Sequence, residues 1–424
     1  MTSKAAQKTT EQCFVYMTLP GQTEFVTAGR FALTQDRRGT PLGRFVYGKS
    51  YLARRDAVAI DPVELKLSDE TYQTARLDGM FGALRDSGPD HWGRRIIEKN
   101  AGKTQLGELD YLLFSADDRA GALGFGLGQK PPGPRRNFNK TLELEKLQRI
   151  AAALIADEKP EPGDDVAQVQ NLMLIGTLMG GARPKAVVED EAGLWVAKFN
   201  RDDDRWNNTR VEHAMLELAK SCGLGVATSR VGKVGGKDVL LVRRFDREKT
   251  QKGYTRARML SGLTLLRADE AANARERWSY VLMAEELRRV VAEPKKDAPE
   301  LFRRMVFNAL ISNIDDHPRN HALIAKERDW KLSPAYDLTP SAVIAQDHRD
   351  LAMTVGDQGR FANAKNLLSQ HTRFLLDADE AKAIVAEMTE QVRATWYDVA
   401  RAQGVSEKDA QAISAAFVYK GFAR

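Results

Sequence analysis

The sequence predicts an α+β protein with a strand-rich first part and a helical second part. Three observations predict this class. Apolar and polar residues alternate around turn residues between positions 13 and 60, strand patterns flank one helix between positions 185 and 245, and helical periodicity dominates beyond about residue 270. Because a strand-rich half precedes a helical half, we expect two lobes, and a chain of 424 residues is long enough to bury a cleft between them.

The composition is that of a globular protein without membrane spans. Hydrophobic residues make up 43% of the chain and charged residues 29%, and no apolar stretch approaches the length of a membrane span. The N-terminal residues MTSKAAQKTTEQ lack the apolar middle region of a secretory signal, so we expect a cytoplasmic protein with no membrane partner. Cys13 and Cys222 lie far apart in dissimilar contexts, which favours packed thiols over a disulfide.

The elements follow one another in a clear order. Residues 13–60 predict a small antiparallel sheet, and the segment QKPPGPRRNFNK, residues 129–140, marks a boundary. After a helix-like stretch and a polar break at residues 157–165, a glycine loop precedes the strand patterns KAVVED and GLWVAKFN. The next helix ends near Gly223, a natural C-terminal cap, and two further strand patterns follow it. Strong helical periodicity then appears in YVLMAEELRRVVAE, PELFRRMVFNALISN and DEAKAIVAEMTEQVRATW.

The segment NIDDHPRN, residues 313–320, carries the most informative polar residues. Asp315 and Asn320 are five positions apart, and Asp337 follows a hairpin-like stretch shortly downstream. An aspartate that orients a hydroxyl, together with two residues that hold Mg²⁺ on ATP phosphates, is what a protein-kinase-like phosphotransferase requires. The D-x-x-x-x-N spacing selects Asp315 rather than Asp316. Taken alone, the motif fits a polar cap and turn after a helix equally well.

Other parts of a phosphate site can be assigned, each with an ordinary structural alternative. The loop GTLMGGARPK, residues 176–185, could bring backbone N–H groups to phosphate oxygens, with charge from Arg183 and Lys185, or be a plain connection. Lys198 ends a strand, where a kinase places its phosphate-gripping lysine, although lysine is common there. Glu212 on the next helix could pair with Lys198, but a solvated glutamate is the default expectation.

Two rival interpretations use other residues. His317 and His321 have the spacing of a helical metal pair, but Pro318 interrupts a regular helix and no H-E-x-x-H glutamate accompanies them. The net charge of +6, a small difference between 64 basic and 58 acidic residues, permits a nucleic-acid partner. Residues 399–413 resemble a helix-turn-helix, yet the second helix would present Glu407 and Asp409 to DNA, which favours a plain helical hairpin.

Several motifs together resemble the HipA family, the serine/threonine kinase toxins of bacterial toxin–antitoxin modules. They are GGARPK, VRRFDR, NIDDHPRN and SPAYDLTPS, and YLARRDAVAIDPVELKL, FGALRDSGPDHWGRR and DDRAGALGF are similar to the family's N-terminal subdomain. The likeness extends from about residue 20 to about residue 400, with the motifs in family order. It implies a two-lobed, protein-kinase-like fold with an all-helical C-terminal lobe. The implied regions are an N-terminal subdomain (1–145), a kinase core with glycine loop and hinge (146–250) and a helical lobe with catalytic and metal-binding loops (251–424).

The resemblance also implies roles for particular residues. Asp315 is the catalytic aspartate, Asn320 and Asp337 hold Mg²⁺, and the backbone of a hinge strand meets adenine, with Asp246 beside it. The residues expected to bind ATP are Gly180, Gly181, Ala182, Lys185, Lys198, Arg243, Phe245 and Asp337. The implied partners are a HipB-like antitoxin, DNA only through that antitoxin, and a protein substrate of the translation apparatus such as an aminoacyl-tRNA synthetase.

One position departs from the family pattern. Family members commonly carry a serine in the glycine loop whose autophosphorylation switches the kinase off, and this chain has Leu178 there, beside Thr177. Self-inactivation by that route is therefore in doubt, and Thr177 is expected to be at most a weak site. Two alternatives to an active kinase stay open: a DNA-associated corepressor that acts with an antitoxin, and a pseudokinase scaffold. The presence of Lys198, Asp315, Asn320 and Asp337 counts against the pseudokinase.

Overall fold

The computed structural model describes residues 11–90, 93–95, 97–98, 106–115, 119–133, 139–140, 144–145, 147–148, 183–270, 272–341 and 345–423. These residues fall into two compact units. The first unit contains the described residues up to 133 together with residues 248–258, and the second contains the remaining described residues. Among the described residues, no helix combines the length and apolar character needed to cross a membrane.

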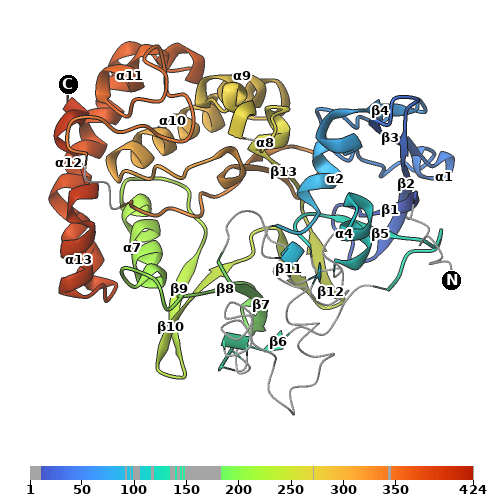
Figure 1. Ribbon diagram of the computed structural model, residues 1–424, viewed down its shortest axis with the longest axis horizontal. Coiled ribbons are helices and arrows are strands. Elements are labelled where there is room, and N and C mark those ends of the chain that lie inside the picture. The colour runs from blue at the N-terminus through green and yellow to red at the C-terminus, as the bar shows by residue number, and fades with distance from the viewer. Residues whose placement is uncertain are drawn as a thin grey trace, which may run out of the picture. The chain divides into compact units, whose positions relative to one another are not determined.

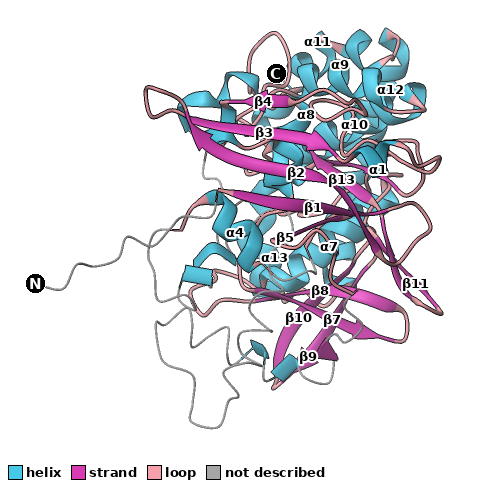
Figure 2. Ribbon diagram, turned by 90° about the vertical axis from the view of Figure 1, so that its right-hand side faces the viewer, coloured by secondary structure: helices cyan, strands magenta, loops and turns pink. Residues whose placement is uncertain are grey.

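An antiparallel sheet organises the first unit, with strand order β4-β3-β2-β1-β5 (Figure 1, Figure 2). Alternation along β2 and β3 buries Phe31 and Phe45 beside the exposed Arg30 and Arg44, as a half-buried sheet requires, whereas Val15 and Met17 lie in a stretch of the central strand β1 that is buried on both faces. The sheet predicted for residues 13–60 is therefore confirmed for its first three strands. The strands are β1 (Gln12–Thr18), β2 (Phe25–Gln35), β3 (Pro41–Tyr47), β4 (Tyr72–Thr74) and β5 (Leu123–Gly126), and the helices include α1 (Lys49–Leu52), α2 (Gly82–Asp86) and α4 (Glu108–Phe114).

Asp61 is a fully buried carboxylate in the first unit. Its Oδ1 accepts backbone N–H groups from Val63 and Glu64 at 2.7 and 2.6 Å, whereas Oδ2 has no hydrogen-bond partner among the described residues. Burial raises the pKa of Asp61 from 3.8 to about 6 despite these bonds. The folded protein therefore binds this proton more tightly than the unfolded chain, and stability falls as the pH rises from about 4 to about 6.

Replacing Asp61 by asparagine should remove this part of the pH dependence. Asparagine stays neutral and still offers an oxygen to the same N–H groups. We expect the variant to match the wild-type free energy of unfolding near pH 4 and to exceed it by up to about 3 kcal/mol at pH 7. Urea unfolding of both proteins at a series of pH values measures the difference. A difference that does not change with pH would show that Asp61 ionises normally.

A second sheet in the other unit carries much of the candidate site. Its order is β6-β7-β8-β10-β9, and all pairings are antiparallel except that of β6 with β7. Helix α7 (Asn208–Ser221) packs on β9 and β10 and also on α12 (Figure 1). The strands are β6 (Asn139–Lys140), β7 (Lys185–Asp190), β8 (Gly193–Phe199), β9 (Ser229–Val234) and β10 (Lys237–Arg243).

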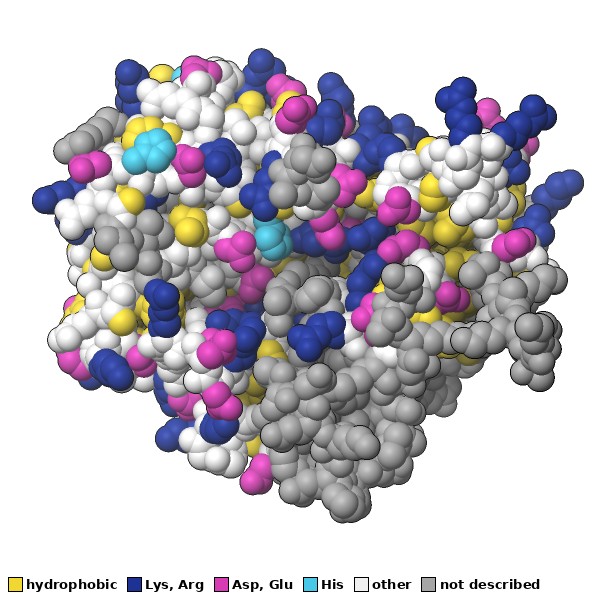
Figure 3. Space-filling model, viewed as in Figure 1, with side chains coloured by type: hydrophobic (Ala, Val, Ile, Leu, Met, Phe, Trp, Pro, Cys, Tyr) yellow, Lys and Arg dark blue, Asp and Glu magenta, His cyan; other side chains and the backbone are white. Residues whose placement is uncertain are grey.

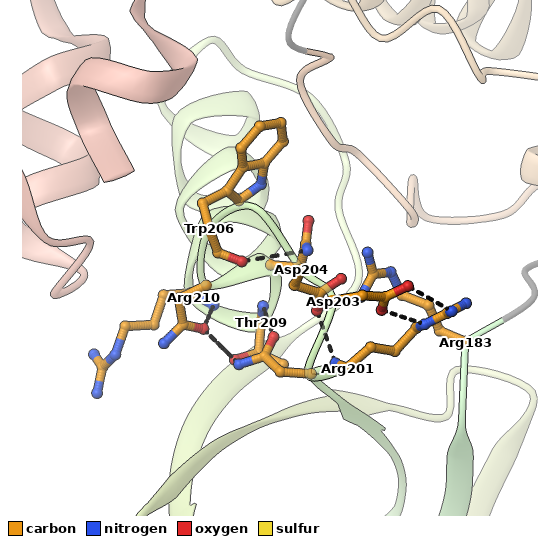
Figure 4. Close-up of polar contacts among 10 residues, drawn as sticks. Arg183, Arg201, Asp203, Asp204, Trp206, Thr209 and Arg210 are labelled. Atoms are coloured by element: carbon orange, nitrogen blue, oxygen red, sulfur yellow. Dashed lines mark hydrogen bonds and ion pairs between the residues drawn. The ribbon is translucent and has the colours of Figure 1, made fainter. Parts of the chain in front are cut away.

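The β8–α7 connection is held by a polar network (Figure 4). Asn207 caps α7 by accepting the Arg210 backbone N–H at 3.2 Å, and its amide donates to Asp238 at 2.6 Å. Arg183, two residues before β7, forms an ion pair with Asp204 at 2.7 Å. This pairing directs the Arg183 side chain to the connection, where it anchors the first turn beyond β8.

Helices pack together in the last part of the chain. The core there includes Leu287, Leu301, Phe302 and Phe307, all fully buried. The three helices predicted from periodicity are confirmed, although the middle one begins five residues before the predicted start. The principal helices are α9 (Tyr280–Val290), α10 (Pro294–Leu310), α11 (Ala364–Ser369), α12 (Ala378–Ala402) and α13 (Glu407–Ile413).

The expectation of an all-helical C-terminal lobe was wrong. A three-stranded sheet combines β13 (Arg258–Ser261), β14 (Ala322–Ala325) and β15 (Lys331–Leu332), and the hairpin-like character expected of residues 321–332 is confirmed by the antiparallel pair β14–β15. The hairpin of β11 (Arg247–Thr250) and β12 (Gly253–Arg256) belongs almost wholly to the first unit. These strands are two to four residues long, too short to show a period of two.

Helices α12 and α13 form a helical hairpin. Gly404 adopts a left-handed backbone with φ +78° between them, and Ser406 caps α13 by accepting the Asp409 backbone N–H at 3.0 Å. The Tyr397 hydroxyl donates to the Glu407 carboxylate across the turn. Glu407 is thus engaged within the hairpin, which supports the hairpin interpretation over a DNA-reading one. On the face shown in Figure 3, basic and acidic side chains of the described residues are interspersed.

Candidate active site

Two lysines face each other across strands β7 and β8. The antiparallel register sets Lys185 directly opposite Lys198, and Lys185 is buried while Lys198 is half-buried. Directly opposed residues in a sheet have Cβ atoms about 4.5–5.5 Å apart, and like charges at that spacing repel each other. The two lysines therefore require negatively charged groups nearby. Their combined positive charge would also attract a polyphosphate.

Lys198 lies between two carboxylates from separate elements. Its Nζ is 2.6 Å from Glu212 on α7 and 2.7 Å from Asp337, which follows β15. Burial opposes the charge on Lys198, but the two carboxylates outweigh it and raise the pKa of Lys198 above its usual value. The default expectation of a solvated Glu212 was wrong: helix α7 packs its Glu212 face against the sheet, so this side chain is 5% exposed and meets Lys198.

Asp337 combines an unusual backbone with an electrostatic environment that keeps it ionised. Its φ of +60° is in the left-handed region, which costs energy for residues other than glycine and is least costly for Asp and Asn. Burial would raise the pKa of Asp337, but the adjacent Lys198 and the nearby Lys185 hold it below the usual range. The carboxylate is therefore available as an anionic ligand at neutral pH.

The loop after α10 presents Asp315 to solvent. Ser312 has a left-handed φ of +52°, and the Asn313 backbone N–H donates back to the Asn308 carbonyl at 2.9 Å, which ends the helix. Asp315 is exposed, and its backbone carbonyl accepts the Asn320 side-chain amide at 3.2 Å. The surrounding protein and the negative charges of Asp337 and Asp316 raise the pKa of Asp315. The loop thus offers an accessible carboxylate close to Asp337.

Asp316 has a different environment from its neighbour. Its side chain is 1% exposed, accepts the Tyr280 hydroxyl and lies 2.8 Å from His321 Nε2. A carboxylate held in the core in this way cannot reach a substrate, whereas Asp315 can.

Asn320 supplies an atom that fits a metal ion. The side chain is buried, and its Oδ1 has no hydrogen-bond partner among the described residues, although buried amide oxygens are nearly always satisfied. Amide and carboxylate oxygens are preferred ligands of Mg²⁺, which usually takes one or two protein ligands and completes its shell with phosphate and water. Asn320 and Asp337 therefore fit a nucleotide-bound Mg²⁺.

The two histidines have unrelated environments. His321 contacts Asp316 in the core, while the His317 ring lies 6.3 Å from the Trp278 ring, centroid to centroid. Within the part of the chain that the structure describes, no group of three or more His, Cys, Asp or Glu side chains is arranged to hold a metal ion. A zinc site built on the two histidines therefore has no support from the described residues.

The predicted hinge strand is built on a buried ion-pair cluster. Asp246 pairs with Arg244 at 2.8 Å and with Arg247 at 2.7 Å, and all three side chains are almost fully buried. The Arg243 backbone N–H donates to the Thr228 carbonyl at 2.8 Å. The Phe245 ring lies 5.7 Å from that of Tyr336, just before Asp337. Asp246 therefore fixes the chain direction after β10 rather than facing a ligand.

The glycine-loop residues Gly180, Gly181 and Ala182, together with Thr177 and Leu178, lie outside the described residues. Of the other predicted residues, the structure brings Lys185, Lys198 and Asp337 together and places Asp315 and Asn320 in one loop beside them. Sequence reasoning missed Tyr280 and the role of Asp316. The doubled aspartate in NIDDHPRN was the available signal, because an aspartate whose side chain is buried needs a hydrogen-bonding partner.

Family models match most of the chain. Residues 26–126 match the HipA N-terminal domain, and residues 177–396 match the HipA-like C-terminal domain. The chain is 23% identical over 354 residues to a Sinorhizobium fredii protein called "Putative kinase Y4mE", covering 76% of this chain and 77% of that one. It is 24% identical over 187 residues to a Haemophilus influenzae protein called "Putative kinase", covering 39% and 52% of the two chains.

A solved structure shares the fold. The HipA chain of the Shewanella oneidensis MR-1 HipA, HipB and operator DNA complex superposes with a TM-score of 0.68 at 16% identity, covering 95% of this chain and 94% of that one. This likeness shows a mixed fold of helices and sheets like that of HipA. Together with the two family models, which span more than half of the sequence, it leads to one conclusion: the chain belongs to the HipA family.

Proposed function

We propose that this chain is a cytoplasmic, Mg²⁺-dependent protein kinase that transfers the γ-phosphate of ATP to a serine or threonine hydroxyl. One observation carries the proposal: Lys198 is held between Glu212 and Asp337 at 2.6 and 2.7 Å. In kinases the strand lysine that grips the ATP phosphates is paired with a helix glutamate, and a downstream aspartate holds Mg²⁺. Asp315 and Asn320 complete the set of polar groups that this chemistry requires.

Each residue has a separate task in this proposal. Lys198 and Lys185 bind the phosphates, and the backbone of Gly180, Gly181 and Ala182 is proposed to cover them. Asn320 Oδ1 and the Asp337 carboxylate would hold Mg²⁺, which when bound neutralises charge on the phosphates. In a two-lobed arrangement of kinase type, these groups would line the cleft.

Asp315 acts on the acceptor. Its exposed carboxylate accepts a hydrogen bond from the substrate hydroxyl and orients the oxygen towards the γ-phosphorus. As the new P–O bond forms and the bond to the β-phosphate oxygen breaks, the hydroxyl proton passes to Asp315 and ADP leaves. The raised pKa of Asp315 makes this carboxylate a better proton acceptor than an ordinary aspartate.

Main-chain atoms after β10 are proposed to bind adenine. The Arg243 N–H already donates to the Thr228 carbonyl and is therefore not left for adenine. The Arg243 carbonyl is proposed to accept from the adenine amino group. Among the described residues the Phe245 backbone N–H donates no hydrogen bond, which makes it the natural donor to a ring nitrogen. Because only backbone atoms are used, the exposed Arg243 side chain can be replaced with little effect on ATP affinity.

A HipB-like antitoxin is the proposed protein partner. The structural neighbour is a HipA chain in a complex with HipB and operator DNA, and the present chain matches 94% of it. We extend this to the present protein as an antitoxin that binds it and contacts DNA on its behalf. The proposed substrate belongs to the translation apparatus, for which an aminoacyl-tRNA synthetase is the first protein to test.

Label transfer with and without metal tests the proposed activity. The purified chain is incubated with γ-labelled ATP and a cell lysate, with Mg²⁺ in one arm and excess EDTA in the other. We expect label on protein in the Mg²⁺ arm and a loss of at least about a hundredfold with EDTA, because the phosphate charge is then uncompensated. Absence of label in both arms, with ATP still bound, would instead indicate a pseudokinase.

A further inference from the structure

A buried polar cluster lies directly beneath the exposed Asp315. Asp316 accepts the hydroxyl of Tyr280, the first residue of α9, and lies 2.8 Å from Nε2 of His321, which follows the 3-10 helix Pro318–Asn320. Asn308 on α10 donates its side-chain amide to the Tyr280 oxygen at 3.3 Å. All four side chains are at most 3% exposed. The cluster therefore ties the catalytic loop to two helices through side chains alone.

The side chains of the cluster depend on one another for their hydrogen bonds. His321 Nδ1 has no hydrogen-bond partner among the described residues, so Asp316 supplies the one hydrogen bond that orients the ring. The Tyr280 and His321 rings pack edge to face with centroids 5.5 Å apart. A buried carboxylate is costly unless it is hydrogen-bonded. Asp316 is thus confined to one position by Tyr280 and His321.

Fixing Asp316 also fixes Asp315. Backbone bonds surround the pair: the His317 N–H donates to the Asp315 carbonyl at 2.8 Å, and Asn313 is bonded to Asn308 through both backbone and side chain at 2.9 and 3.0 Å. Because this backbone is held in place and the Asp316 carboxylate points into the core, the carboxylate of the adjacent Asp315 faces solvent. The position of the Asp315 carboxylate is therefore set by groups that do not touch the substrate.

We propose that Tyr280, Asp316 and His321 are positioning residues that hold Asp315 at the reacting hydroxyl. This inference rests on the proposed kinase function and deepens it. Positioning contributes strongly to phosphoryl transfer, and a displacement of about 1 Å can cost roughly a hundredfold in rate. Loosening the cluster should slow transfer at saturating ATP without weakening ATP binding, because Lys198, Lys185 and Asp337 are anchored elsewhere.

Tyr280→Phe tests the proposal with little change in shape. The phenyl ring keeps the packing but removes the donor to Asp316. Tyr419→Phe is the matched control, since Tyr419 is also buried in the second unit and its hydroxyl donates to the Ala362 carbonyl at 3.0 Å. Label transfer to lysate protein is measured across ATP concentrations, and melting temperatures are compared.

We expect Tyr280→Phe to lower the rate at saturating ATP by roughly ten- to a hundredfold. The ATP concentration for half-maximal rate should stay within about twofold of wild type. Tyr419→Phe should lower the melting temperature to a similar extent but leave the rate unchanged. Two variants of Asp316 provide a second, independent test. Asp316→Asn still accepts from Tyr280 and should therefore retain more transfer than Asp316→Ala.

The outcomes separate this inference from the proposed function. A wild-type protein without transfer overturns both. Wild-type transfer that Tyr280→Phe and Asp316→Ala leave undiminished overturns the positioning role alone. An equal loss in Tyr280→Phe and Tyr419→Phe also overturns it, because any buried hydrogen bond would then have the same effect.

Discussion

Replacing Asp315 by asparagine is expected to reduce phosphoryl transfer by at least about a thousandfold while ATP still binds. Asparagine has the same shape, so the loop and its bond from Asn320 to the residue 315 carbonyl are retained. The amide cannot accept the hydroxyl proton, however, and its NH₂ group cannot replace the carboxylate as an acceptor. Label transfer at saturating ATP and calorimetric ATP binding measure the two effects separately.

Arg243→Ala provides the control for this experiment. Its side chain is exposed and its backbone is proposed to meet adenine, so transfer and ATP affinity should both remain near wild type. Transfer by Asp315→Asn at the wild-type rate would contradict the proposed catalytic role of Asp315. A loss of ATP binding in that variant would instead point to a folding defect in the loop.

Replacing Lys198 by methionine is expected to affect both activity and stability. The phosphates lose their principal cation, which should lower transfer by at least about a hundredfold. Glu212 and Asp337 are also left without their partner, and unpaired buried charges of this kind cost about 3–5 kcal/mol. Label transfer and urea unfolding are the two measurements.

A double variant distinguishes these two effects. Adding Glu212→Gln to Lys198→Met removes one of the two unpaired charges, so part of the lost stability should return. Transfer should not return, because the phosphates still lack Lys198. A double variant as unstable as the single one would mean that Lys198 and Glu212 are not coupled, and restored transfer would show that Lys198 is not the phosphate-binding cation.

Local patterns in the sequence suggested part of the candidate site. Asp315 and Asn320 were predicted from a spacing within one loop, and Lys198 from its place at the end of a strand. Such features depend on a few consecutive residues, so composition and periodicity reveal them. The same holds for the sheet at residues 13–60 and for helices α9, α10 and α12, whose patterns are long enough to show a period.

Contacts between distant segments could not be read in this way. Glu212 was expected in solvent because nothing in its helix indicates that Lys198 faces it across the sheet. The tie of Tyr280 to Asp316 joins residues 36 positions apart, and the opposition of Lys185 and Lys198 depends on strand register. Strand β13 was missed for another reason, since four residues carry too little pattern, whereas β14 and β15 lie in residues 321–332, which were expected to be hairpin-like.

The most direct test of the central claim is to locate the transferred phosphate. ATP carrying heavy oxygen in its γ-phosphate is incubated with Mg²⁺, cell lysate and either the wild-type chain or Asp315→Asn, and phosphopeptides are identified by mass spectrometry. We expect heavy phosphate on serine or threonine of particular proteins with wild type and none above background with the variant. Equal heavy labelling with both proteins, or with neither, would contradict it.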